Sequence, residues 1–170
     1  MPEETPWLQS IEEAIVERLK AKITGIQIEA LPEKPFNNVH PKGAILVMLA
    51  GINPGKTLDM FTSIQEATLS YEVYLKSRSL RDHTGLYPLI SQTIDALLGW
   101  RPNQAKPLRL EKAFPTGYND GEWGFSLTFS TETVLVPCQE DPDADVPPMT
   151  NISFKNCGNC GCEEEGDCEC

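Results

Sequence analysis

One stretch of the sequence carries residues of the type and spacing that bind a nucleotide. The octet Ala50-Gly-Ile-Asn-Pro-Gly-Lys-Thr57 follows an apolar run and satisfies a relaxed phosphate-binding loop, in which Gly or Ala precedes Gly-Lys-Thr by four free positions. Such a loop wraps phosphate with backbone N–H groups, while Lys reaches the terminal phosphates and Thr holds magnesium. The octet therefore makes nucleotide binding one candidate function.

Three features of the same stretch oppose a phosphate-binding loop. Pro54 lacks the N–H that the position before Gly55 needs. A helix of several turns is expected after Thr57, but a strand-like alternation begins soon after it, and no later apolar strand ends in an Asp that could orient magnesium. We therefore interpret Asn53-Pro54-Gly55 as a turn between two strands, and residues 51–57 as a loop projecting from a strand end.

A second candidate chemistry lies near the C-terminus, where five cysteines fall within fourteen residues. Their CxxC and CxC spacings allow neighbouring thiolates to converge on one soft metal ion, such as zinc or the iron of an iron–sulfur cluster. No His accompanies them and nearby carboxylates would repel thiolates, so disulfides formed in an oxidising medium are an equal alternative. The candidate ligands are Cys157, Cys160, Cys162, Cys168 and Cys170.

Catalytic residues are scarce. The two histidines, His40 and His83, have no evident partners for acid–base work, although His83 follows Asp82. No Ser or Cys lies in the context of an activated nucleophile. We therefore expect no enzyme and no required cofactor, apart from a metal on the cysteines.

Charge and hydropathy restrict the partners. Residues 1–137 carry sixteen acidic and thirteen basic side chains, whereas residues 138–170 carry nine and one, within a total net charge of −11. Nothing is basic enough for direct binding of nucleic acid. No apolar run reaches the roughly 20 residues of a membrane span, and the acidic N-terminus does not resemble a secretory signal, so we expect no membrane partner and synthesis in a reducing cytoplasm.

Two segments show helical spacing. Apolar residues recur every three or four positions from Leu8 to Ile23, with a capping box at Ser10 to Glu13 as the predicted start and Gly25 as the stop. The same spacing predicts a second helix over residues 87–100, ending at Gly99.

The remaining periodic segments predict strands. Alternation indicates strands over residues 26–30 and 67–76, and the continuous apolar run 44–49 predicts a strand covered on both faces. Residues 108–114 and 122–136 form a predicted hairpin with its turn at 117–121.

The resulting order, α-β-β-β-α-β-β, predicts an α+β fold: a mainly antiparallel sheet with two helices packed on one face. Prolines, glycines and acids dominate after Cys138 and leave too little apolar surface to order the segment. We therefore expect one domain over residues 1–137 and an irregular, acidic, Cys-rich tail over residues 138–170.

Three segments together resemble a known family. They are IEEAIVERLKAKI in the first helix, GLYPLISQTIDALLGW in the second, preceded by the strand ending KSRSLRD, and the closing GFSLTFSTETVL. Over about residues 10–137 the chain resembles the tail-terminator, or tail-completion, proteins of Mu-like contractile-tailed bacteriophages. The Cys-rich tail departs from that pattern and inherits no role from it.

This resemblance implies a structural virion protein rather than an enzyme. Such proteins form a hexameric ring at the head-proximal end of the tail, cap the tube and sheath, and join the tail to the neck. The implied partners are further copies of the chain, the tube, the sheath and neck or connector proteins, and assembly would occur in the host cytoplasm. Another neck or head-to-tail connector protein is the alternative, and a nucleotide- or metal-binding module comes third.

The sequence also suggests which segments meet neighbours. The predicted loops 31–43 and 52–65 are long enough to be contact elements, and Lys76, Arg78 and Arg81 form a basic cluster suited to an acidic neighbour. A neutral body with a long strand is compatible with a ring built from subunit contacts.

Overall fold

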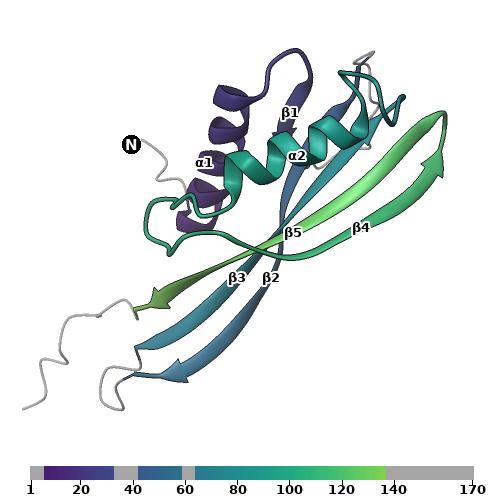
Figure 1. The fold of residues 1–170 in the computed structure, drawn as a ribbon. Helices are drawn as coiled ribbons and strands as arrows, with labels where there is room; N and C mark the ends of the chain where they lie inside the picture. Colours follow the sequence, from purple (N-terminus) through teal and green to yellow (C-terminus); the bar gives the residue numbers. More distant parts are fainter. Residues whose placement is uncertain (1–5, 33–41, 59–63, 137–170) are drawn as a thin grey trace, which may run out of the picture. The chain divides into compact units, whose positions relative to one another are not determined.

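A computed structural model describes residues 6–32, 42–58 and 64–136 of the chain. Two helices and five strands alternate along these residues (Figure 1). In chain order they are α1 (Trp7–Lys22), β1 (Gln27–Ala30), β2 (Ala44–Thr57), β3 (Gln65–Ser77), α2 (Leu86–Leu97), β4 (Arg109–Asn119) and β5 (Glu122–Leu135).

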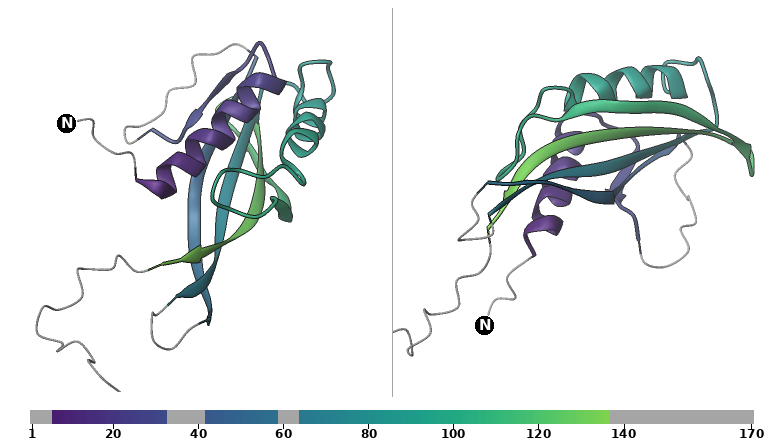
Figure 2. Two further views of the ribbon diagram at one scale, coloured as in Figure 1. Left: turned by 90° about the vertical axis from the view of Figure 1, so that its left-hand side faces the viewer. Right: turned by 90° about the horizontal axis from the view of Figure 1, so that it is seen from below.

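The five strands form one sheet in the order β1-β2-β3-β5-β4. The short β1 runs parallel to β2, and every other neighbouring pair is antiparallel. Both helices contact the same face of the sheet, α1 over β1 and β2 and α2 over β3 and β5 (Figure 2). The predicted α+β fold, with its element order, is confirmed.

The hydrophobic core lies between that face and the helices. Every second side chain of β3 points into it and is fully buried, from Leu69 through Tyr71 and Val73 to Leu75, which explains the alternation in the sequence. The core residues of α1 recur at the helical spacing: Ile11, Ile15, Val16 and Leu19. The start of β2 is buried on both faces, as its unbroken apolar run predicts.

The predicted start of the first helix is wrong by about one turn. The helix begins at Trp7, directly after Pro6, and no side chain caps it. Ser10 lies inside the first turn, where its hydroxyl donates to the Trp7 carbonyl at 2.7 Å instead of accepting from an end amide. Proline can open a helix because its missing N–H would lack a partner there in any case.

The interpretation of residues 51–57 as a turn and loop is also wrong. The strand β2 continues through the octet to Thr57 and pairs with β3, with Asn53 opposite Thr68 and Pro54 opposite Ala67. Proline is tolerated because a register irregularity follows it and the strand end is exposed. An extended strand cannot curl its amides around a phosphate, so the octet has no phosphate-binding geometry.

The closing hairpin is confirmed, but its turn is tighter than predicted. β4 continues to Asn119, which pairs with Glu122, so only Asp120 and Gly121 form the turn. Both have positive φ, +52° and +80°, as a two-residue type I′ turn requires. Asp-Gly is a favoured pair for this geometry, which explains why the strands extend further than the Gly-rich composition suggests.

In the described part of the chain, no helix is long and apolar enough to cross a membrane. Residues 137–170, with all the candidate metal ligands, lie outside the described residues, as do His40 and most of the 31–43 loop. The division at residue 137 therefore stays a prediction.

Candidate functional site at the two uncovered ends of the sheet

The helices cover only the middle of the sheet, and the strands extend past them in two directions (Figures 1 and 2). At one end, the β4–β5 hairpin projects with every residue from Glu111 to Asp120 exposed. At the other, β2, β3 and the end of β5 run on together, and β2 is exposed from Ile52 to Thr57. The two ends are separated by the 14 residues of β5, roughly 45 Å of extended chain.

The hairpin tip, residues 113–124, carries aromatic side chains that the core does not use. Tyr118 is 59% exposed and Phe114 45% exposed. The Tyr118 and Trp123 rings lie 4.8 Å apart across the two strands, tilted by 49°, which fixes the direction of Tyr118. Asp120 and Glu122 give the hairpin tip two negative charges and no positive one.

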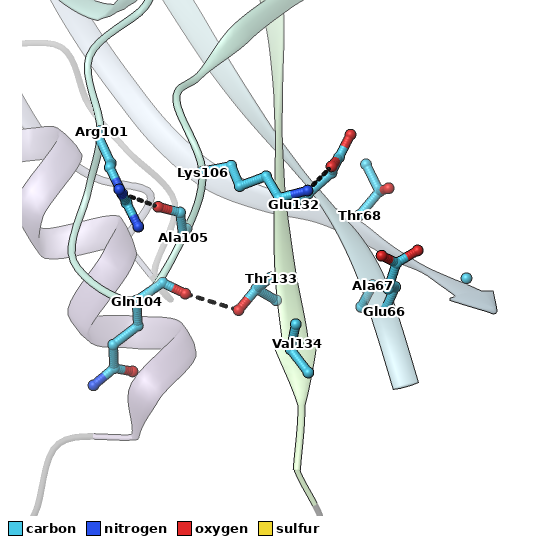
Figure 3. Close-up of a pocket in the computed structure, with 11 residues that line it drawn as sticks. Glu66, Ala67, Thr68, Arg101, Gln104, Ala105, Lys106, Glu132, Thr133 and Val134 are labelled. Atoms are coloured by element: carbon cyan, nitrogen blue, oxygen red, sulfur yellow. Dashed lines mark hydrogen bonds and ion pairs between the residues drawn. The ribbon is translucent and has the colours of Figure 1, made fainter. Parts of the chain in front are cut away.

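The opposite end of the sheet holds a hollow of about 500 Å³ (Figure 3). β2, β3 and β5 form one wall, and the segment between α2 and β4 forms the other. This segment lies beside β5 because the Lys106 N–H donates to the Glu132 carbonyl at 2.8 Å and the Thr133 hydroxyl donates to the Gln104 carbonyl at 2.8 Å. The lining residues are Gly55, Glu66, Ala67, Thr68, Arg101, Gln104, Ala105, Lys106, Glu132, Thr133 and Val134.

An ion network gives the hollow its charge. The Lys106 ammonium lies 2.7 Å from Glu132, whose other oxygen meets the Arg109 guanidinium. The hydrogen bond with Glu132 raises the pKa of Lys106, and the two cations together lower the pKa of Glu132. Arg101 donates to the Ala105 carbonyl at 3.0 Å and makes no ion pair with any described residue, so its charge is available to a partner.

The sheet face away from the helices is polar between these two ends. Ser126 donates to Glu72 at 2.5 Å and Ser130 donates to Glu111 at 2.5 Å, so both buried hydroxyls are paired with carboxylates of adjacent strands. No described buried side-chain polar atom lacks a partner. The buried hydroxyls of this face are therefore satisfied within the sheet.

The residues singled out in the sequence are dispersed. In the basic cluster, Lys76 lies over the Tyr74 ring and Arg78 lies 4.0 Å from Glu122, so only Arg81 has no described ionic or aromatic contact. His83 is exposed in the loop before α2. Among the described residues, no three His, Cys, Asp or Glu side chains gather as a metal site would require.

Sequence reasoning missed both the hairpin tip and the hollow. Phe114 ends a predicted strand and Tyr118 lies in the predicted turn, so neither position indicates a projecting surface, and the hollow combines four separate segments. The available signal was Asp120-Gly121, a favoured pair for a two-residue turn. Such a turn keeps both strands paired as far as Asn119 and Glu122.

Comparison with solved structures shows where this fold occurs. A chain in the virion of a native gene transfer agent particle matches with a TM-score of 0.51 at 14% identity, over 77% of this chain and 100% of that one. A chain in the sheath/tube terminator structure of PVC, an extracellular contractile injection system, in its extended state, matches with a TM-score of 0.54 at 14% identity, over 98% of this chain and 67% of that one. The fold is therefore one found in a gene transfer agent virion and in a contractile injection system.

The sequence pattern of the Gp37 protein family matches residues 15–156. The chain belongs to this family. The match passes the predicted domain end at residue 137 and stops just before Cys157, so the cysteine segment lies outside the family pattern. No curated protein sequence matches the chain.

Proposed function

We propose that this chain is a tail terminator, a structural virion protein that forms a ring, caps the tube and sheath of a contractile tail and joins the tail to the neck. The observation that carries the proposal is the fold shared with a chain of a sheath/tube terminator structure, over nearly the whole length of this chain. The membership of the Gp37 family agrees with the tail-terminator resemblance in the sequence.

The arrangement of the surface supports a role in assembly. Exposed aromatic and aliphatic side chains lie at both uncovered ends of the sheet, including Tyr118 at one end and Val134 at the other. Such residues contribute strongly to protein interfaces when a partner buries them. Two different patches on one subunit suit a head-to-tail contact, which closes into a ring when the rotation between copies divides a full turn.

The proposed partners are further copies of this chain, the tail tube, the sheath and a neck or connector protein, with no direct contact to nucleic acid and no membrane. The proposed ring is a hexamer at the head-proximal end of the tail, built in the host cytoplasm and retained in the virion. We propose no enzymatic activity.

Loss of the protein from assembling particles tests the terminator role. A terminator stops polymerisation of tube and sheath, so particles made without it should carry tails of irregular length, and the purified protein should have about six times the 18.9 kDa chain mass by light scattering. Electron microscopy of the particles reads out tail length. Tails of normal length that fail to join heads would support the alternative, a neck or connector protein. Particles that assemble normally without the chain would contradict both.

The chemical state of the cysteine segment is a separate proposal. We propose that Cys157, Cys160, Cys162, Cys168 and Cys170 either hold one zinc ion or iron–sulfur cluster or form disulfides, the two outcomes that their spacing allows. Elemental analysis and thiol titration of the purified chain separate them. About one equivalent of zinc, or about two to four equivalents of iron, supports the metal, and less than about a tenth of an equivalent with few free thiols supports disulfides.

A further inference from the structure

The two ends of the sheet differ in shape. The exposed Tyr118 ring, which contacts the half-buried Trp123 ring, lies on the projecting hairpin at one end, whereas the hollow of about 500 Å³ opens at the other end. The strand registers place them apart, because Trp123 pairs with Ser77 at one end of β3 and Leu135 pairs with Gln65 at the other. Tip and hollow within one subunit therefore cannot meet.

Their charges are complementary. At the hairpin tip, Arg78 lies 4.0 Å from Glu122 and offsets its charge, whereas Asp120 makes no ion pair with any described residue. Asp120 therefore supplies the negative charge that the tip offers to a neighbour. The charged groups at the hollow are three cations, Arg101, Lys106 and Arg109, and two carboxylates, Glu66 and Glu132. The Asp120 carboxylate and a hollow with an excess of positive charge attract each other, which favours this pairing over contact between identical ends.

The backbone of β4 argues against a simpler contact. An open edge strand can add a strand of another subunit, but β4 carries two register irregularities, near Glu111 and Thr116, and Pro115 lies between them. Bulges and proline are the devices that disfavour edge-to-edge strand pairing. The hairpin is therefore better suited to contact a neighbour through the side chains of its tip.

We propose that the hairpin tip of one copy docks into the hollow of the next copy around the ring. In this contact the Tyr118 ring packs against the Gly55 and Val134 side of the hollow, and the Asp120 carboxylate pairs with Arg101. The inference rests on the proposed function, because it assumes the ring, and it adds the residues that join the subunits. The occupant of the hollow is a second copy of this chain.

The opposite placement of tip and hollow gives the contact its symmetry. Two copies that share one tip–hollow contact still have one free tip and one free hollow, so further copies add in the same orientation. Assembly then continues until the ring closes. A two-fold dimer would instead require two antiparallel copies, with the tip of each in the hollow of the other, which would leave no free tip or hollow.

A double-mutant cycle on the charge pair tests the proposal. Asp120→Asn removes the charge while asparagine keeps the left-handed backbone that this turn position requires. We expect Asp120→Asn and Arg101→Gln each to weaken assembly about fivefold, and the double variant to be no weaker than the stronger single effect. Sedimentation velocity over a dilution series measures assembly. The matched control Asp95→Asn, which removes an exposed charge on α2, should assemble as the parent does.

Removal of the aromatic knob tests the packing half of the contact. Tyr118→Ser should weaken assembly at least tenfold, because the ring would be buried at the centre of the contact. Tyr87→Ser, which removes an equally exposed ring on α2, is the control and should have no effect. Thermal unfolding of each variant checks that the hairpin still folds.

The outcomes separate this inference from the proposed function. A parent chain that forms rings, together with Tyr118 and Asp120 variants that form them equally well, overturns the tip–hollow contact and leaves the terminator role standing. Additive losses in the Asp120 and Arg101 double variant also overturn the pairing. A parent chain that stays monomeric and is absent from particles overturns the proposed function itself.

Discussion

Beyond the end of β1, a side chain of α1 replaces the missing strand as the hydrogen-bond partner of β2. β1 ends at Ala30, and the Leu49 N–H of β2 donates to the Glu12 carboxylate of α1 at 3.2 Å. The Tyr71 hydroxyl of β3 donates to the Leu8 carbonyl of α1 at 3.4 Å. Burial raises the pKa of Glu12, although the hydrogen bond from Leu49 opposes this shift. Burial is also the larger cause of the raised pKa of Tyr71, and the negative charge of Glu12 is the smaller one.

The raised pKa of Glu12 predicts a pH dependence of stability. The folded chain binds this proton more tightly than the unfolded chain, so the contribution is full below the ordinary pKa of 4.5 and is lost as the pH rises through the folded-state pKa. Relative to Glu12→Gln, which cannot titrate, the parent should therefore lose stability as the pH rises above 4.5. Urea unfolding at several pH values measures this. Glu17→Gln, at an exposed position of α1, is the control. A parent chain that becomes more stable relative to Glu12→Gln as the pH rises would contradict the assignment.

Lys56 is the residue that a phosphate-binding loop could not lose. In the structure it is exposed on the strand end of β2 and has no role in the core. We therefore expect Lys56→Ala to change the free energy of unfolding by less than about 0.5 kcal/mol, and calorimetry to detect no nucleotide binding by the parent chain. Binding of a nucleotide by the parent that Lys56→Ala abolishes would refute the assignment of this octet to a strand.

Among the elements, the pairing of β2 with β3 depends on a close backbone approach at its start. Gly43 has φ +137°, and a Cβ there would lie 2.3 Å from the Lys76 carbonyl oxygen. No side chain can be accommodated without separating the strands. Gly51, further along the pairing, has open space on its Cβ side.

This difference predicts that a Gly→Ala substitution has different effects on stability at these two positions. Gly43→Ala should destabilise the fold by about 2 kcal/mol or more, because strain in the backbone adds to the clash. Gly51→Ala should be neutral or stabilise by up to about 1 kcal/mol, since alanine restricts the unfolded chain. Thermal and urea unfolding compare both with the parent. Equal effects at the two positions would mean that the approach of Gly43 to β3 does not control the pairing.

At the scale of the whole molecule, charge is divided unequally along the chain. The body of residues 1–137 is nearly neutral, whereas residues 138–170 carry most of the net charge of −11. The predicted domain boundary follows from this charge distribution and from the Pro-, Gly- and acid-rich composition after Cys138.

A shortened chain ending at residue 137 tests that boundary. We expect it to fold and to unfold within about 4 °C of the full chain, because it keeps the whole described core. Circular dichroism during heating measures the midpoint. Because the family pattern continues to residue 156, a second chain ending at residue 156 is the matched comparison. A large loss of stability at 137 that is absent at 156 would place the boundary after the family region.

Local sequence patterns predict the order of the helices and strands and most of the core. The three- and four-residue spacing around Ile15 and the alternation around Tyr71 arise because each element buries one face, so local pattern and tertiary burial agree. The family resemblance also follows from these segments.

The two ends of the sheet, in contrast, depend on contacts between segments that are distant in the chain. The octet of residues 50–57 contains Pro and Gly, which are typical of a turn, yet pairing with β3 holds it extended. The hollow joins Gly55, Arg101, Lys106 and Val134, which local periodicity cannot bring together. Strand pairing and loop packing depend on partners distant in the chain, so local residue preferences predict the elements but not the surface that the elements form.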